Sequence, residues 1–237
     1  MPLAYDDDVD IIGRNKREVS AAFSRFVEEA HKVGLAVNED KTKYLVSTTK
    51  NPSLGGFVEI DRFKFEVVKD FVYLGSSINT ANNISLEIKR RITLASRCYF
   101  GLSRQLSKRA LSRKTKTCLY KTLIMPVLLY GAEAWTLSTA DEQALGVFER
   151  KVLRKIYGPY CDCGVWRIRW NHELYGLYGD IDIVKRIKIQ RLRWLGHVVR
   201  MLLKDVSTLG IRSWRQSARN RQQWCQELSA AKTCNRL

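Results

Sequence analysis

The sequence has no uninterrupted apolar run long enough to cross a membrane. A membrane-spanning helix needs about 20 predominantly apolar residues, whereas the most apolar stretch, 123–135, is shorter and contains Pro126 and Glu133. The N-terminal residues turn acidic at once, unlike those of a secretory signal peptide. We therefore expect no transmembrane helix and no signal peptide, and we expect an intracellular protein, nuclear or cytoplasmic.

Cysteine is too sparse for a disulfide scaffold. Six cysteines in 237 residues fall well below the share found in small disulfide-rich domains, and a reducing compartment is the default. A structural zinc site would need two close pairs of ligands. Cys161 and Cys163 have only His172 close by and no second pair. We therefore expect no zinc.

Acidic residues are scarce outside the first third of the chain. The whole sequence has 41 Lys and Arg against 24 Asp and Glu, a net charge of +17. Residues 1–86 carry a net charge of −2, and the remainder carries +19. Such a basic region favours a polyanionic partner, either nucleic acid or an anionic membrane surface.

The apolar periodicity predicts an α+β fold. Short strand-like segments and one amphipathic helix over 16–33 fill residues 1–80, and helical spacing dominates afterwards. The expected strands are 3–5, 9–12, 35–37, 44–46, 57–60, 63–68 and 71–74. The expected helices cover 84–99, a buried pair around Pro126 within 119–137, 140–156, 182–201 and 212–232, and Thr139 with Glu142 has the spacing of a capping box.

Three consecutive aspartates follow an aromatic residue at the tip of the first expected hairpin. Tyr5 precedes Asp6, Asp7 and Asp8, and apolar residues flank them on both sides. A tight hairpin presents neighbouring carboxylates rigidly, and two-metal phosphoryl transfer needs carboxylates that converge on a pair of Mg²⁺ ions. The alternative is an acidic turn on a solvated surface.

Several ordered motifs resemble those of reverse transcriptases from non-LTR (LINE-type) retrotransposons. The hairpin 3–12 resembles their aromatic-Ala-Asp-Asp motif, 34–42 resembles the next palm motif, and 71–75 resembles the primer grip. Further segments resemble the C-terminal part of endonuclease–reverse transcriptase proteins: 130–135, 166–169, 191–198, 221–224 and 231–233. The resemblance covers nearly the whole chain.

The resemblance implies a role for each matched residue. Asp7 and Asp8 would be the catalytic pair that holds Mg²⁺ against the incoming nucleotide and the primer 3′-hydroxyl. Tyr5 would pack beside the primer terminus, and Lys41 would lie near the triphosphate, although it could equally be a surface lysine. Tyr73, Leu74 and Gly75 would position the primer strand, with an ordinary strand and turn as the alternative.

The resemblance also implies the organisation and partners of the chain. It predicts a partial polymerase palm of short antiparallel strands and one helix over 1–80, a helical thumb-like region over 81–157, and a basic, Trp- and Arg-rich helical region over 158–237. The implied partners are an RNA template and a DNA primer or target, without a membrane. The reaction would be RNA-directed DNA synthesis.

Basic residues on the expected helices are candidates for contacts with nucleic-acid phosphates. All six tryptophans fall in the last part of the chain, mostly beside arginine, a composition that suits single-strand binding. Trp194 shares a stripe with other apolar residues of the helix 182–201, so we expect it in the core. The candidate phosphate contacts are Lys89, Arg90, Arg97, Arg104, Lys108 and Arg109 in the thumb-like region, and Lys185, Lys188 and Arg193 further on.

Three departures from the family pattern favour an incomplete polymerase. First, Asp6 stands where the family commonly has alanine. Second, the family's fingers and its earlier palm aspartate lie upstream of the hairpin and are absent here. Third, only residues 202–210 separate the Gly-His-Val segment from the closing Trp-Arg helix, which are usually further apart. We therefore expect a polymerase fragment that is inactive alone. The alternatives are a non-catalytic RNA- or DNA-binding protein derived from a retrotransposon and a product without selected function.

We predict that Asp6→Ala increases primer extension by a complete polymerase that carries this hairpin. The third carboxylate adds like charge beside Asp7 and Asp8 and repels the primer phosphates. Extension on a labelled primer–template would be compared between the two forms. A rate that does not rise would count against a harmful Asp6.

Overall fold

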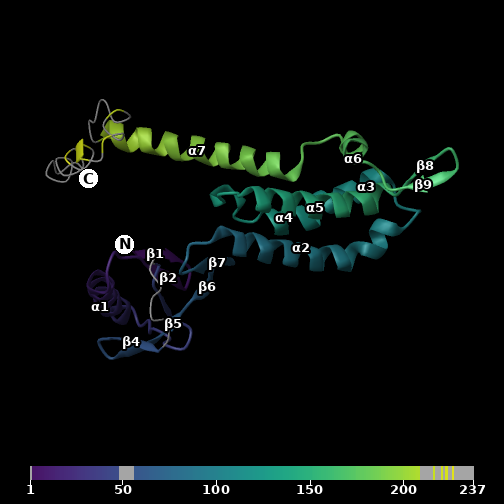
Figure 1. Ribbon diagram of the computed structural model, residues 1–237. Coiled ribbons are helices and arrows are strands. Elements are labelled where there is room, and N and C mark those ends of the chain that lie inside the picture. Colours follow the sequence, from purple (N-terminus) through teal and green to yellow (C-terminus); the bar gives the residue numbers. More distant parts are fainter. Residues whose placement is uncertain are drawn as a thin grey trace. The chain divides into compact units, whose positions relative to one another are not determined.

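The computed structural model describes residues 2–47 and 56–208, together with positions 216, 220, 222, 223 and 226. The chain divides into two compact units, Met1–Thr93 and Leu94–Leu237, which are described separately. Helix α2 (Ile84–Ser107) belongs to both units. The expected α+β class is confirmed (Figure 1), whereas most of the expected helix 212–232 lies outside the described residues.

Unit 1 begins with the predicted hairpin, followed by the predicted helix. Strands β1 (Pro2–Tyr5) and β2 (Asp8–Ile11) pair antiparallel with Tyr5 opposite Asp8, which leaves a two-residue turn. Helix α1 (Lys16–Lys32) starts where the Asn15 side chain accepts a hydrogen bond from the Glu18 N–H at 2.9 Å. Such a cap satisfies a backbone donor that has no partner within the helix.

The expected strand 35–37 is not formed. The N–H of Leu35 donates to the carbonyl of Ala30 at 2.9 Å, and that of Gly34 donates to His31 at 3.1 Å. These bonds close the end of α1 around Gly34, whose φ is +79°. Because the helix end uses these donors, the following residues do not begin a ladder.

The core of unit 1 packs α1 on a three-stranded sheet. The strand order is β3 (Lys43–Leu45), β5 (Phe63–Val68) and β4 (Phe57–Ile60), with β3 parallel to β5. Phe23 of α1 meets Phe63 and Phe65 edge-on, with ring centroids 5.3 and 5.2 Å apart. The alternation of buried and exposed residues along β5 is that of a strand with one face in the core.

A second hairpin of unit 1 was only half predicted. Strand β6 (Asp70–Tyr73) matches the expected strand 71–74, but β7 (Ser76–Asn79) was missed. The turn residues Leu74 and Gly75 have φ values of +44° and +78°. Positive φ at both positions is the geometry of tight hairpin turns, which usually have the sequence Asn-Gly. Because leucine is uncommon in such turns, the sequence did not indicate a hairpin here.

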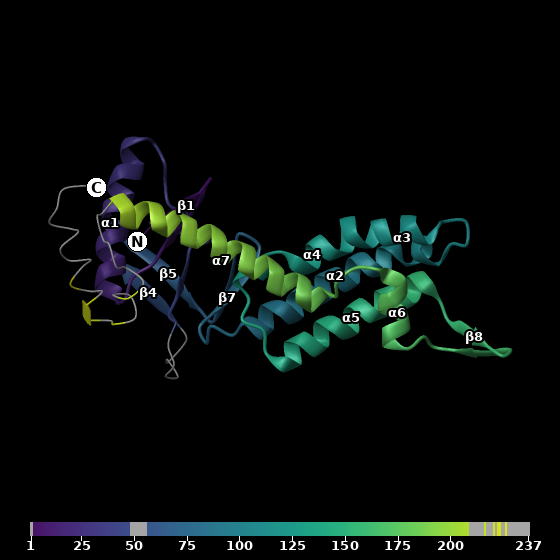
Figure 2. The same ribbon diagram turned by 90° about the horizontal axis from the view of Figure 1, so that it is seen from above.

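Unit 2 is a helical assembly with one small hairpin. Besides the second part of α2, its elements are α3 (Arg113–Leu119), a π-helical turn (Tyr120–Ile124), α4 (Met125–Leu129), a 3₁₀ turn (Ala132–Ala134), α5 (Thr139–Tyr157), β8 (Tyr160–Asp162), β9 (Val165–Arg167), α6 (Asn171–Tyr178) and α7 (Ile183–Thr208). The hairpin β8–β9 projects beyond the ends of α5 and α6 (Figures 1 and 2). The sequence did not reveal this hairpin or α6.

The expected pair of helices around Pro126 is not formed. The chain runs from α3 through the π-helical turn directly into α4, with Pro126 in the first turn of α4. The N–H of Met125 donates to the carbonyl of Tyr120, one residue further back than in an α-helix. The π-helical turn thus accommodates a proline that lacks its own N–H.

Helix α5 is confirmed, but its cap lies one residue earlier than expected. Ser138, rather than Thr139, accepts from the Asp141 N–H at 3.2 Å, and the Asp141 carboxylate accepts from the Ser138 N–H at 3.1 Å. Gly158 ends the helix as its spacing predicted, with φ +71°. Asp141 therefore takes the role assigned to Glu142.

Helix α7 is confirmed and extends to Thr208, but Trp194 is not in the core. Ile183 and Ile187 are fully buried, whereas Trp194 is 51% exposed and Leu195 is 56% exposed. The first turns of α7 pack on the 3₁₀ turn and α5, and its second half extends past the other helices of unit 2 (Figure 1). The apolar stripe therefore continues beyond the surface that buries it.

A fully buried carboxylate joins four segments of unit 2. Glu149 of α5 is 0% exposed and accepts hydrogen bonds from the Tyr120 hydroxyl (3.1 Å), the Tyr175 hydroxyl (3.0 Å) and the Ile183 N–H (3.0 Å). Burial raises the pKa of the Glu149 carboxyl above its ordinary value, although the three hydrogen bonds act in the opposite direction.

We predict that Glu149→Gln removes a pH dependence of stability. Because the pKa of Glu149 is higher in the folded chain, wild-type stability is greatest below the unfolded value near 4.5 and falls as the pH rises through the folded value. Unfolding by urea would be measured between pH 4 and 8. The free energy of unfolding of the variant, relative to that of wild type, should therefore increase as the pH rises from 4 to 8.

Glu133→Gln, at an exposed position, is the control for losing one negative charge. Parallel pH profiles for wild type and Glu149→Gln would contradict the prediction.

Candidate nucleic-acid interface

The first hairpin holds the predicted carboxylates in fixed places at its tip. Asp6, with φ +53°, and Asp7 form the turn, and Asp8 begins β2. Alternation along the strand puts Asp8 and Asp10 on one face, with Tyr5 opposite Asp8 on the neighbouring strand. Tyr5 is 69% exposed, so the tip offers an accessible aromatic ring beside carboxylates.

The opposite face of the hairpin attaches it to unit 1. Ile11 packs against the buried cluster of Phe23, Ile60, Phe63 and Phe65. Since β2 contributes to this packing, the core of unit 1 holds the tip in position.

Tyr73 lies within electrostatic reach of the hairpin. Partial removal from water raises the pKa of the Tyr73 hydroxyl, and the negative charges of Asp10 and Asp8 raise it further. Two of the predicted motifs therefore lie within range of a charge interaction, although more than 60 positions separate Tyr73 from Asp8 and Asp10 in the sequence.

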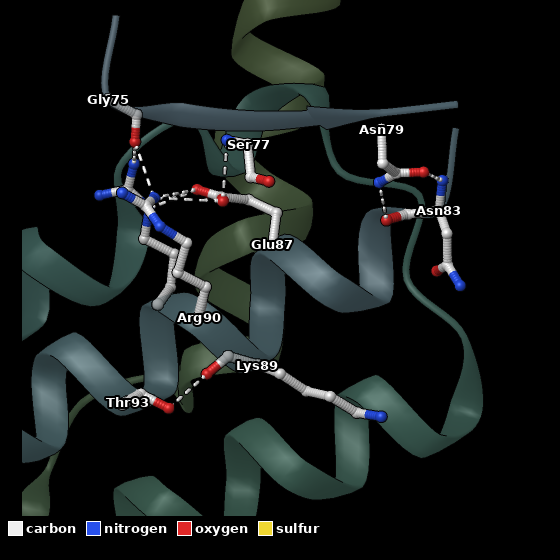
Figure 3. A network of polar contacts seen from close by, with 9 residues as sticks. Gly75, Ser77, Asn79, Asn83, Glu87, Lys89, Arg90 and Thr93 are labelled. Carbon is white, nitrogen blue, oxygen red and sulfur yellow. Dashed lines mark hydrogen bonds and ion pairs between the residues drawn. The ribbon is translucent and has the colours of Figure 1, made fainter. Parts of the chain in front are cut away.

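A network around Glu87 fixes the turn that follows Tyr73 (Figure 3). The buried Glu87 carboxylate accepts from the Ser77 N–H at 3.0 Å, from Arg91 Nε at 2.6 Å and from Arg90 at 3.3 Å. Both arginines also donate to the carbonyl of Gly75, Arg90 at 2.9 Å. The turn is thereby tied to the first part of α2.

Arg90 therefore has an internal role in the structure. We predicted it as a phosphate contact, and its side chain instead spans the Gly75 carbonyl and the Glu87 carboxylate. Leu74 and Gly75 occupy the turn itself. Sequence reasoning missed Glu87, because ion pairs three and four residues apart on a helix usually lie on its surface, and the sequence does not show that this one is buried.

Lys41 lies in a tight turn of unit 1. Its N–H donates to the Asn38 side chain at 3.1 Å, and its side chain is exposed. Its predicted role near a triphosphate stays a prediction.

The oxygen ligands of Asp7 and Asp8 suit Mg²⁺ chemically, since this ion prefers carboxylates and water. Within residues 2–47 and 56–208, however, no group of three or more His, Cys, Asp or Glu side chains is arranged to hold a metal ion. Cys161, Cys163 and His172 also form no such group.

The other predicted basic residues divide by exposure and pairing. Lys89, Arg97, Arg104, Lys108 and Arg109 are exposed. Arg97, Arg104 and Lys108 follow helical spacing, so they run along one side of α2 and the turn after it. Phe100 beside them is 63% exposed, and the Lys151 ammonium lies 5.2 Å from its ring centroid.

The candidates on α7 are partly engaged. Lys185 pairs with Asp182 at 3.2 Å, and Lys188 pairs with Glu142 at 2.7 Å. Exposed pairs of this kind contribute about 0–1 kcal/mol, so a phosphate could replace the carboxylate. Arg193 is exposed.

None of the described helices is both long and apolar enough to span a bilayer.

The chain is similar to a transposon-derived protein. It is 27% identical over 199 residues to a putative uncharacterized transposon-derived protein of Caenorhabditis elegans, and the alignment covers 84% of this chain and 71% of the relative. No protein-family model matches the chain, and no solved structure matches it. The similarity supports a transposon origin.

We predict that Glu87→Ala destabilises unit 1 by about 3–5 kcal/mol, because it leaves the buried Arg91 without its carboxylate. Urea unfolding would measure the loss, and hydrogen exchange would show faster exchange of the Ser77 amide. Glu29→Ala is the matched control, since the Glu29–Lys32 pair is exposed and should contribute about 0–1 kcal/mol. Equal effects of the two substitutions would refute a structural role for Glu87.

Proposed function

We propose that this chain carries the C-terminal part of an RNA-directed DNA polymerase from a non-LTR retrotransposon. Residues 1–80 correspond to part of the palm, and the basic helices that follow bind the template–primer. The chain then binds an RNA template paired with a DNA primer, and it does not extend the primer alone.

One observation carries the proposal: Tyr73 lies within electrostatic reach of Asp8 and Asp10. The resemblance assigns Tyr73 to the primer grip and Asp8 to the catalytic pair, and a polymerase needs these two elements close together. A solvated acidic turn gives no reason for a tyrosine so distant in sequence to lie within range of these charges. The similarity to a transposon-derived protein agrees with this origin.

The exposed basic residues supply the binding surface. Arg97, Arg104 and Lys108 along α2 can contact successive backbone phosphates without reading sequence. Lys89, Arg109 and Arg193 add to the positive field. Binding of this kind is steered by charge and weakens steeply with salt.

Asp7 and Asp8 are the residues that would hold Mg²⁺. When bound, the ion would supply charge neutralisation at the nucleotide phosphates and the primer hydroxyl. Asp6 places a third carboxylate directly beside the pair, and its negative charge repels the phosphates of the primer and the nucleotide. We therefore propose binding without extension.

A non-catalytic RNA- or DNA-binding protein derived from a retrotransposon is the second candidate. Asp6 in the turn favours it, since the basic helices need no intact metal site. The two candidates differ in whether the hairpin acts in a polymerase that also has the remaining palm.

We predict that affinity for a labelled RNA–DNA primer–template falls linearly with salt on a double logarithmic scale. Each phosphate contact contributes about −0.9 to the slope of log K, where K is the association constant, against the logarithm of the salt concentration. In fluorescence anisotropy, the double substitution of Arg97 and Arg104 by Ala should make this slope less negative by nearly 2. Addition of dNTPs and Mg²⁺ should then yield no extension.

Arg25→Ala, at an exposed position of α1, is the matched control and should leave the slope unchanged. Binding that is insensitive to salt would overturn the phosphate-binding surface. Primer extension by this chain would overturn the incomplete site.

A further inference from the structure

The hairpin β8–β9 and the segment after it display aromatic and aliphatic side chains to solvent. Val165 is 68% exposed, Trp166 69%, Ile168 72% and Trp170 62%. The hairpin projects beyond α5 and α6 in both views (Figures 1 and 2). Arg167 and Arg169 alternate with these side chains along the chain.

The arginines fold onto the hairpin instead of extending into solvent. Arg167 donates to both oxygens of Glu173, at 2.9 and 2.6 Å, and its guanidinium carbon lies 4.7 Å from the Tyr160 ring centroid. Arg169 donates to the Gly158 carbonyl at 3.1 Å and also lies over Tyr160, at 5.3 Å. The hydrogen bonds with Arg167 lower the pKa of Glu173 to about 2, which keeps this pair charged at all ordinary pH values.

Trp166 lies on the other face of the hairpin. The strand register puts Arg167 opposite Tyr160 and Trp166 opposite Cys161, and neighbours along a strand point to opposite faces. The arginine layer therefore stiffens one face, and the Trp166 ring stands on the other face with most of its surface in water.

The size and charge of this surface favour nucleic acid over protein as its ligand. A stable protein interface buries about 800 Å² on each partner, whereas an aromatic side chain buries roughly 150–250 Å². The few exposed side chains of a narrow hairpin therefore fall short of a protein interface, while one ring suffices to stack a nucleobase. Between 151 and 173 the chain has five basic and two acidic residues, a net charge of +3 that attracts a polyanion.

We infer that the hairpin β8–β9 binds single-stranded nucleic acid by stacking an unpaired base on Trp166. The inference deepens the proposed function, on which it rests, by naming the unpaired part of the nucleic acid as the ligand of this hairpin. Exposed Lys155, in the last turn of α5, supplies charge for the flanking phosphates.

The test compares two labelled 12-nucleotide single strands by anisotropy with the full chain. One strand carries uracil bases, and the other has abasic sites throughout. Wild type should bind the base-containing strand more tightly, and Trp166→Ala should weaken that binding by about 5- to 150-fold, the range for one stacked base, while leaving the abasic strand unaffected. Trp166→Phe should retain much of the preference.

Val165→Ala is the matched control, since Val165 is equally exposed on the arginine face. Equal affinity of wild type for both strands would overturn the inference. Equal losses on both strands in Trp166→Ala would also overturn it, as would no loss on either strand, which is the expected result if the hairpin contacts protein. Duplex primer–template affinity, measured in parallel, depends on α2 and separates failure of this inference from failure of the proposed function.

Discussion

The buried carboxylate of Glu149 constrains the folding of unit 2 more than any other polar group described. A carboxylate removed from water needs hydrogen-bond donors, and its donors come from the π-helical turn, from α6 and from the first residue of α7. Each of these segments is distant from α5 in sequence, and each supplies one donor. The start of α7 is thus fixed by a polar requirement, and apolar packing of Ile183 and Ile187 then sets which face of the helix turns inward.

Unit 1 uses a buried acid in a comparable way but pairs it with cations. Glu87 brings together Arg90, Arg91 and the backbone of β7, so that the turn at Gly75 is held against α2. Tyr73 immediately precedes this anchored turn. In both units, a buried acid holds separate segments together and is not among the candidate binding residues.

The sequence predicts the elements whose signal is local. The periodicity of α1 and β5 and the glycine after α5 are enough to place these elements. The turn at Leu74 and the partners of Glu149 depend on contacts across the chain, which periodicity does not report. Trp194 shows the same limit, because a stripe on a helix does not reveal where the surface that covers it ends. The primer-positioning role of Tyr73 was expected only from the family resemblance.

The π-helical turn at Tyr120 determines how this part of the chain would respond to the deletion of one residue. A π turn is equivalent to one additional residue in an α-helix, and each residue rotates the helix by about 100°. Loss of one residue within 120–124 would restore regular α-helical bonding, yet it would turn α3 relative to α4 and direct the Tyr120 hydroxyl away from Glu149. A deletion that improves the local helix would therefore leave a buried charge with one donor fewer, so the irregularity is preserved by the fold as a whole.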